Sequence, residues 1–383
     1  MNFTKLQKYM DSFYLEKNVP GSGIAVYYRH EPVFEYYTHY ANVEKKIPFA
    51  RDTIVNLYST SKVITCSAAL QLVEQGKFKL SDPLYEYIPE YKDMFVRTFI
   101  DGKEEIVRAK NPLLIENLFT MSGICDYGVS PAFQKKLDEM DKNATTLDII
   151  KEMAKIPLAF EPGTHYQYGF SHDVLGGLIE AVSGQLLGDY LEKNIFSRIG
   201  MIETFFDVPE DKKDKLAVHY CGFNAKNETY NSIGEVASFK LKEKYQAGGA
   251  GLKSSVRDYI LFSEMLCNYG TAKNGEVILK KETINDMRRN RLHQISQKDF
   301  DEFGNWAKFG YGYGLGVRTL INREQANMLS ELGEFGWDGL CGCYTLSDPE
   351  SEMAIFYAQL EHGTSAWEWH KLTTNMAYEA VNN

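Results

Sequence analysis

Residues 58–62 of this 383-residue chain read YSTSK, and residues 63–74, which follow, carry a continuous apolar side that ends at Gly76. The pattern predicts a helix over 63–74 with Ser59 and Lys62 at its start. Side chains three positions apart share one face of a helix, so these two are expected to meet. Burial disfavours the charged form of a lysine, and a neutral amine can take a proton from a serine. The stretch therefore indicates a nucleophilic Ser59 activated by Lys62.

The same stretch has a plainer interpretation. A serine and a lysine at this spacing often occur by chance, and Ser59 could simply cap the helix while Lys62 lies in water. In the catalytic interpretation, the free backbone N–H groups of the helix N-terminus would face a developing oxyanion. Features elsewhere in the sequence are needed to distinguish the catalytic interpretation from the helix-capping one.

Strand patterns lie on both sides of this helix and further helical patterns follow it. Alternating aromatic and β-branched residues predict strands over 24–28 and 33–37, joined by a polar turn. Further helices are expected over 1–17, 113–119, 146–154, 174–182, 253–265 and 364–381, and further strands over 311–319, 341–346 and 353–358. Residues 207–245 are charged and poor in pattern, which predicts a long functional loop or flap.

Strands thus open and close the chain, with helices between them. This order predicts an α/β protein of the α+β type, in which an antiparallel sheet is built from the N- and C-terminal segments with flanking helices. We place the sheet domain at 1–60 and 240–383 and an inserted, mainly helical domain at 61–239. The active site is expected at the interface between them.

Composition narrows the function classes. The hydrophobic fraction is 44%, which is typical of a globular protein, and the formal net charge is −10. So acidic a chain is a poor partner for nucleic acid or an anionic membrane, because phosphate binding requires a basic surface. The basic run Arg288, Arg289 and Arg291 is interpreted as a solvated helix end. An interaction scaffold, suggested by the 25 tyrosines, remains an alternative.

Cysteine usage and the N-terminus bear on the compartment. The six cysteines form no C-x-x-C pair and no zinc spacing, so buried free thiols in a reducing compartment are expected. Residues 1–17 lack the features of a signal peptide, and no run approaches about 18 apolar residues. We therefore expect a cytoplasmic protein without a membrane span.

Several segments outside the helix carry a family resemblance. They are 20–21, the predicted strand pair, 56–58, 72–83 (LVEQGKFKLSDP) and 117–123 (NLFTMSG). Together with YSTSK they resemble serine β-lactamase-related proteins: class C β-lactamases, DD-peptidases and family VIII carboxylesterases, with a penicillin-binding-protein-like fold. The resemblance extends over nearly the whole chain, and it implies the β-lactamase/transpeptidase-like fold.

The segment 162–168 (PGTHYQY), followed by DVLG at 173–176, is similar to the part of the family that carries the catalytic tyrosine. The resemblance places that tyrosine at Tyr168, with Tyr166 as the neighbour to exclude. A phenol beside a lysine can be held as phenolate or share its proton, and can serve as base toward Ser59 and acid toward the leaving group. Many relatives carry Asn where this chain has Phe170, so a polar contact to lysine or substrate is missing.

A third resemblance concerns Trp337-Asp338-Gly339, where relatives have K-T-G, H-x-G or W-x-G. The tryptophan version resembles the esterase and acyltransferase branch. It implies that Trp337, Asp338, Gly339 and Phe170 line the substrate site and that the backbone N–H groups of Ser59 and Leu340 form the oxyanion hole. An Asp338 carboxylate in the cleft is expected to repel a substrate carboxylate. The glycine-rich turn 248–251 is expected to pack behind the site.

These observations favour an enzyme that forms an acyl-enzyme from a small ester, amide or peptide substrate, without a metal or organic cofactor. A carboxylesterase ranks first, a D-amino-acid-type peptidase or amidase second, and a β-lactamase or penicillin-binding protein third. A binding or sensor protein of the same fold that has lost turnover is the alternative from another class. The sequence leaves the oligomeric state open.

Overall fold

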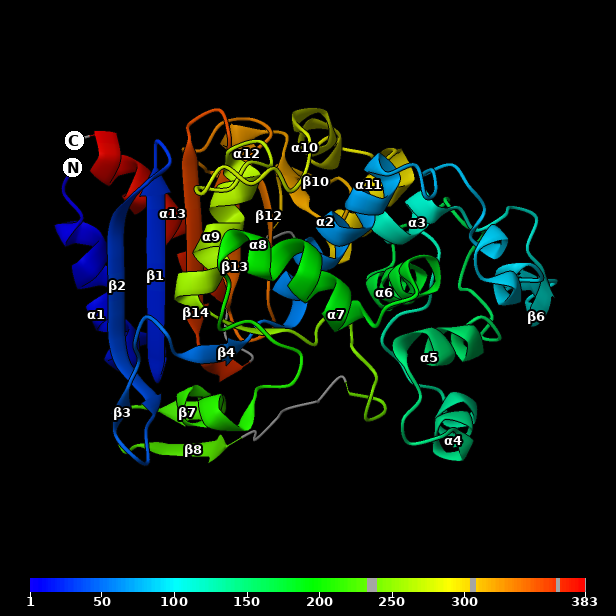
Figure 1. The fold of residues 1–383 in the computed structure, drawn as a ribbon, viewed down its shortest axis with the longest axis horizontal. Helices are drawn as coiled ribbons and strands as arrows, with labels where there is room; N and C mark the ends of the chain where they lie inside the picture. Colours follow the sequence, from blue (N-terminus) through cyan, green and yellow to red (C-terminus); the bar gives the residue numbers. More distant parts are fainter. Residues whose placement is uncertain (233–239, 304–307, 363–365, 383) are drawn as a thin grey trace.

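The computed structural model describes residues 1–232, 240–303, 308–362 and 366–382 (Figure 1). Its largest element is an antiparallel eight-stranded sheet with the strand order β10-β11-β12-β13-β14-β1-β2-β3. The two ends of the chain supply it, as the sequence predicts. The strands are β1 (Gly21–Tyr28), β2 (Glu31–Asn42), β3 (Ile47–Pro48), β10 (Tyr311–Tyr313), β11 (Arg318–Leu320), β12 (Phe335–Asp338), β13 (Tyr344–Asp348) and β14 (Met353–Gln359).

Helices cover both faces of this sheet. In β14, Phe356 stacks on Tyr259 of α9 (Val256–Cys267), with 4.3 Å between ring centroids. The next residue, Tyr357, points the other way and contacts Phe13 of α1 (Thr4–Lys17) and His370 of α13 (Ala366–Asn382). Consecutive strand residues face opposite sides, so α9 lies on one face and α1 and α13 on the other. A strand covered on both sides must be apolar throughout, and every residue of β14 is buried.

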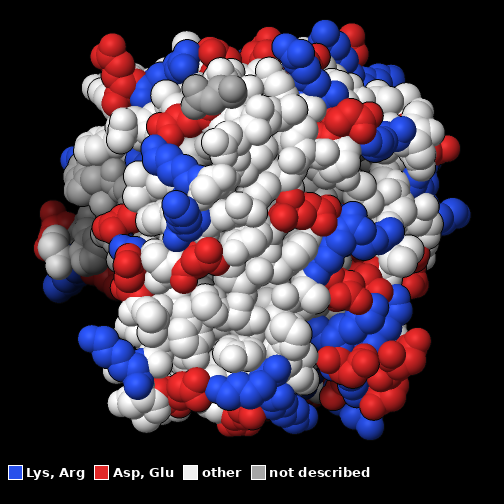
Figure 2. Space-filling model, turned by 90° about the vertical axis from the view of Figure 1, so that its left-hand side faces the viewer, with Lys and Arg blue, Asp and Glu red and all other residues white. Residues whose placement is uncertain are grey.

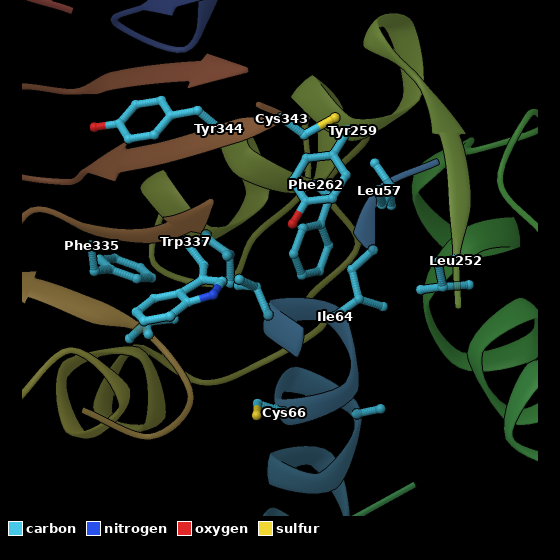
Figure 3. Packing of buried hydrophobic residues seen from close by; sticks show 14 of the residues in the cluster. Leu57, Ile64, Cys66, Leu252, Tyr259, Phe262, Phe335, Trp337, Cys343 and Tyr344 are labelled. Atoms are coloured by element: carbon cyan, nitrogen blue, oxygen red, sulfur yellow. The ribbon is translucent and has the colours of Figure 1, made fainter. Parts of the chain in front are cut away.

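Most of the remaining helices extend beyond the sheet on the right of Figure 1, whereas α12 (Arg323–Ala326) lies above its strands. At their centre is α2 (Ser61–Glu74), the helix predicted from 63–74, and its first twelve residues are all buried. Figure 3 shows Leu57, Ile64, Tyr259 and Phe262 gathered where α2 meets the sheet. The others are α3 (Ile115–Phe119), α4 (Pro131–Glu139), α5 (Thr146–Met153), α6 (Ser171–Ser183), α7 (Leu187–Leu191), α8 (Ser197–Ile199), α10 (Lys281–Met287), α11 (Gln294–Phe303) and α12 (Arg323–Ala326).

Several local predictions need correction. The strand predicted over 311–319 is two strands, β10 and β11, because the chain turns at Gly316, whose φ is 83°. The strand predicted over 341–346 begins at Tyr344, and the two preceding cysteines lie in or next to a turn. The segment 207–245 is more ordered than a loop, although residues 233–239 lie outside the described part. It contains a 3₁₀ helix, Glu210–Lys215, and β7 (Tyr220–Asn224) and β8 (Thr229–Ser232), which pair with each other; β7 also pairs with β15 (Glu361–His362).

Two further strand pairs and six helices, α4, α7, α8, α10, α11 and α12, were not predicted. β4 (Ile54–Asn56) pairs with β9 (Lys253–Ser255) just before the YSTSK segment. β5 (Phe95–Ile100) and β6 (Lys103–Arg108) form a separate hairpin. The helix α11, whose polar sequence hid its amphipathic side, buries Phe300. The structure confirms the predicted fold class.

The surface and the thiols agree with the composition. In Figure 2, which looks onto the side of α1, α13 and β2, basic and acidic side chains are interspersed around a largely uncharged centre. All six cysteines are free; Cys125 and Cys221 are partly exposed and the others are buried. Within the described ranges, no helix is both long enough and apolar enough to cross a membrane.

Candidate active site

Ser59 lies in a single 3₁₀ turn, Tyr58–Thr60, that runs directly into α2. Its side chain is partly exposed, so a substrate can reach it. The preceding residue, Tyr58, has a φ of 46°, in the left-handed region, where a bulky residue is strained by about 1–3 kcal/mol. Strain of this kind is typical of functional sites because the surrounding structure must hold it in place.

The Lys62 amine contacts Ser59, as the spacing predicts. Its Nζ lies 3.1 Å from Ser59 Oγ, 2.8 Å from the Tyr127 hydroxyl and 2.5 Å from the carbonyl oxygen of Gly249. The side chain has no solvent exposure. Burial lowers the pKa of Lys62 to about 7, and the charge of Asp173 opposes that shift. Near neutral pH a large fraction of this amine is therefore uncharged and can accept a proton.

Tyr168 is the tyrosine that the structure brings to Ser59. Its hydroxyl is hydrogen-bonded to the Ser59 side chain and accepts the indole N–H of Trp337 at 3.0 Å. Lys62 Nζ lies 4.6 Å from the centre of its ring. Because an indole N–H only donates, the phenol proton is left to bond Ser59. Burial raises the pKa of Tyr168, which favours the phenol over the phenolate.

Tyr166 points elsewhere. Its ring packs edge-on against Phe300 and Tyr313, at 5.2 and 5.4 Å between centroids. The Tyr168 ring instead stacks with Phe303 of α11, at 4.6 Å between centroids, and with Trp337, at 5.6 Å. Thus α11, which the sequence analysis missed, builds one wall of the site.

Tyr127 is a second residue that the sequence analysis missed. It lies in the loop before α4, where no periodic pattern draws attention to it, and its hydroxyl contacts the Lys62 amine. Phe170 packs edge-on against the Tyr127 ring at 4.9 Å. The polar contact to the lysine that is missing at position 170 is therefore supplied by Tyr127, which Phe170 supports from behind.

The predicted oxyanion segment follows β12. The Gly339 N–H donates to the Cys343 carbonyl at 2.7 Å and the Gly342 N–H to the Gly339 carbonyl at 2.8 Å, which forms a tight turn around Leu340. A Cβ added to Gly339 would lie 2.4 Å from the carbonyl oxygen of Leu57. Only glycine therefore lets this turn come so close to the element that carries Ser59. The role of the Leu340 N–H stays a prediction.

Asp338 differs from the expectation of an unpaired anion in the cleft. Trp337 points toward Tyr168, so its neighbour on the strand points to the other face of the sheet. There Asp338 Oδ1 forms an ion pair with Lys308 Nζ at 2.9 Å, and this pairing lowers the pKa of Asp338 against the effect of burial. Because its charge is balanced, the predicted repulsion of a substrate carboxylate does not follow.

The two histidines near Tyr168 do not line the site. His165 pairs with Asp299 of α11 at 2.9 Å and so fixes that helix to the tyrosine loop. His172 is fully buried, with Nε2 3.5 Å from Cys66 Sγ, and burial lowers its pKa to about 3. As predicted, the glycine turn 248–251 packs behind the site, since Thr65 Oγ1 donates to the Gly248 carbonyl at 2.7 Å.

Comparison with known proteins gives a consistent result. A family model described as beta-lactamase matches residues 4–365. Esterase EstB of Burkholderia gladioli is 24% identical over 409 residues, covering 99% of this chain and 91% of that protein. A putative D-alanyl-D-alanine carboxypeptidase of Escherichia coli K12 is 26% identical over 335 residues, covering 82% of this chain and 70% of that protein. The solved structure of EstCE1, described as a hydrolase with promiscuous acyltransferase activity, superposes with a TM-score of 0.79 at 23% identity and covers 98% of each chain.

Proposed function

The chain belongs to the beta-lactamase family, a serine hydrolase family of esterases, acyltransferases and carboxypeptidases, and on this premise we propose that it is a carboxylesterase acting through an acyl-enzyme on Ser59. One observation carries the proposal: a fully buried amine of lowered pKa lies 3.1 Å from a partly exposed serine hydroxyl. This is the geometry that a general base requires.

The first half-reaction follows from these contacts. As Ser59 Oγ attacks the substrate carbonyl carbon, the hydroxyl proton passes to the Lys62 amine. The backbone N–H groups of Ser59 and Leu340 hold the oxyanion that forms on the carbonyl oxygen. Tyr168 then donates its phenol proton to the leaving alcohol or amine and is reprotonated from the Lys62 ammonium. The carbonyl carbon stays bonded to Ser59 as an ester.

The second half-reaction uses the same groups. Water replaces the leaving group, and Lys62 takes one of its protons as the water oxygen attacks the acyl ester. Tyr168 donates a proton to Ser59 Oγ as the acyl bond breaks and is reprotonated from the Lys62 ammonium, and the acid product leaves. An alcohol in place of water would give acyl transfer by the same steps.

The lining of the site supports ester substrates over β-lactams. Trp337 stands where some relatives carry a lysine or histidine, and its N–H donates to the Tyr168 hydroxyl. Phe170 stands where many relatives carry an amide, and it is buried. Phe303 and Leu340 remain 43% and 48% exposed, so they offer apolar surface beside the reacting groups. Neutral, apolar acyl or alcohol groups match this surface better than a carboxylate does.

A hydrolysis panel tests the proposal. One purified sample is assayed with short-chain p-nitrophenyl esters, nitrocefin and D-aminoacyl anilides, and Ser59→Ala serves as the matched control. We expect ester turnover that exceeds nitrocefin turnover and is absent in the control, with a thermal midpoint close to that of the unmodified protein. Faster turnover of nitrocefin would make this a β-lactamase. Labelling of Ser59 by a fluorophosphonate, with no turnover of any substrate, would favour the binding or sensor alternative.

A further inference from the structure

We infer that Asp173, which lies beside Gly249, is a positioning residue that sets the charge state of the Lys62 amine without touching it; this inference rests on the proposed function. Asp173 lies in the first turn of α6 and is only 1% exposed. The Tyr245 hydroxyl donates to its Oδ1 at 2.7 Å.

The position of Gly249 shows how closely the groups converge. A Cβ built on this residue would lie 2.6 Å from Asp173 Oδ2, 2.8 Å from the Tyr127 hydroxyl and 3.4 Å from Lys62 Nζ. The carboxylate, the phenol and the amine therefore surround a single Cα, and the absence of a side chain there lets them do so. The carboxylate is close enough for a strong electrostatic interaction across this glycine.

Among the residues that the structure describes, the other titratable groups that act on Lys62 or lie next to Asp173 are neutral or already paired. His172, next to Asp173 on α6, is neutral because burial lowers its pKa. Burial also raises the pKa of the Cys66 thiol, one turn after Lys62 on α2. Asp338 on β12 forms its ion pair with Lys308. Of the charges acting on Lys62, that of Asp173 raises its pKa most.

This arrangement suits a group that must change its charge during turnover. A lysine in direct contact with a carboxylate would stay an ammonium, whereas a buried lysine with no carboxylate nearby would be a weak proton acceptor. Asp173 stabilises the ammonium that forms when Lys62 takes the Ser59 proton. Because the carboxylate does not contact the amine, the neutral form of Lys62 is still populated near neutral pH. Burial raises the pKa of Asp173 to about 6, and the hydrogen bond from the Tyr245 hydroxyl opposes that shift, so the carboxylate is mostly ionised near neutral pH.

The sign of the effect follows from the charge. Removing the carboxylate favours the neutral amine, so the pKa of Lys62 falls further below its ordinary value. The limb of the pH–rate profile that Lys62 governs should therefore move to lower pH in Asp173→Asn, by about one unit or more, the usual effect of an opposite charge nearby. Tyr245→Phe, which leaves Asp173 easier to protonate, should move it in the same direction by less.

The pH dependence of Ser59 acylation by a fluorophosphonate probe measures this shift. The matched control is Glu180→Gln, which alters another buried carboxylate on the same helix, one that binds the backbone N–H groups of Leu147 and Leu187 instead. Its limb should stay in place. A purely structural role for Asp173 would lower the plateau rate in Asp173→Asn without moving the limb, and that result would overturn the inference.

A thermal double-mutant cycle tests the same coupling without using activity. Asp173→Asn should lower the thermal midpoint of the wild type, and it should raise or spare that of Lys62→Met, in which the carboxylate has lost its partner. Equal shifts in the two backgrounds would contradict the coupling. If the wild type is never acylated, the proposed function fails, and the cycle still decides whether Asp173 and Lys62 interact.

Discussion

Two buried lysines near strand β12 differ in whether a carboxylate contacts their amine. On the side of Trp337, Lys62 contacts only neutral oxygens among its described hydrogen-bond partners, and burial lowers its pKa to about 7. Lys308, whose Nζ also lies 5.2 Å from the centre of the Trp337 ring, is nearly as buried but pairs with the Asp338 carboxylate at 2.9 Å. The same side chain is thus a proton acceptor or a fixed charge, depending on whether a carboxylate touches it.

The fixed side contains a second pair. Arg318 of β11 and Glu334 are both fully buried, and their charged groups lie 2.9 Å apart. The ring of Trp367, from α13, lies 4.1 Å from Lys308 Nζ and 5.8 Å from the Arg318 guanidinium. This face of the sheet holds its charges in place, whereas the opposite face leaves one lysine without a contacting carboxylate. The comparison therefore separates the groups that react from those that support the fold.

The largest effect is expected where the reactive lysine is removed. Lys62→Met should lower ester turnover by at least about a hundredfold, because it removes the general base, while the buried position still receives an apolar side chain of similar length. Steady-state kinetics and a thermal scan measure the two effects. Turnover within a few-fold of the wild type would show that another group activates Ser59. Lys62 would then not differ from Lys308 in its role.

On the fixed side, breaking a pair should affect stability instead. Arg318→Met leaves the Glu334 carboxylate buried without its partner, which costs about 3–5 kcal/mol of unfolding free energy. Chemical denaturation measures this cost, and Arg318→Met combined with Glu334→Met should recover much of it. The fraction that remains folded should keep its turnover number. A loss of turnover at unchanged stability would place this pair in the reaction.

A smaller effect is expected at Trp337, whose indole N–H reaches the Tyr168 hydroxyl. Trp337→Phe keeps most of the aromatic stacking and removes that hydrogen bond, worth about 0.5–1.5 kcal/mol. We expect a two- to tenfold fall in kcat, by roughly the same arithmetic, with little change in KM. If KM rises and kcat stays the same, the indole serves substrate binding rather than the orientation of Tyr168.

The smallest effect is expected at Asp338. Asp338→Asn breaks its pair with Lys308, but the carboxylate is 27% exposed, and pairs near the surface contribute about 0–1 kcal/mol. The ratio of nitrocefin to ester turnover should stay within about threefold of the wild type, since the charge faces away from Tyr168. A large gain in nitrocefin turnover would instead support the sequence-based prediction that the Asp338 carboxylate repels a substrate carboxylate.

The parts of the site that the sequence predicts are those held by local periodicity or a recognisable motif. Ser59 and Lys62 are three residues apart on one helix, so their contact follows from helical geometry. The resemblance identified Tyr168 and Trp337. Tyr127 could not be found in this way, because it reaches Lys62 from a loop 65 residues away in sequence.

The charges around the site were the least predictable feature. Asp338 has the same sequence neighbours whether it is paired or free, and its partner Lys308 comes from a segment without a pattern. Asp173 was placed within the DVLG segment at the start of a helix, where nothing local indicates that its carboxylate lies behind a lysine of another helix. Pairing across the fold depends on packing, which periodicity does not encode.

The packing around Gly249 limits which amino-acid substitutions this position tolerates. Three polar groups occupy the space around its Cα, so even a methyl group there must displace one of them. In a saturation library of the whole chain, position 249 should thus admit glycine alone while its neighbours are intact. Alanine would require both the Asp173 carboxylate, at 2.6 Å from its Cβ, and the Tyr127 hydroxyl, at 2.8 Å, to move or be removed first, which makes the order of substitutions matter. A substitution at position 249 therefore depends on an earlier change at Asp173 or Tyr127, neither of which is the nucleophile or the lysine.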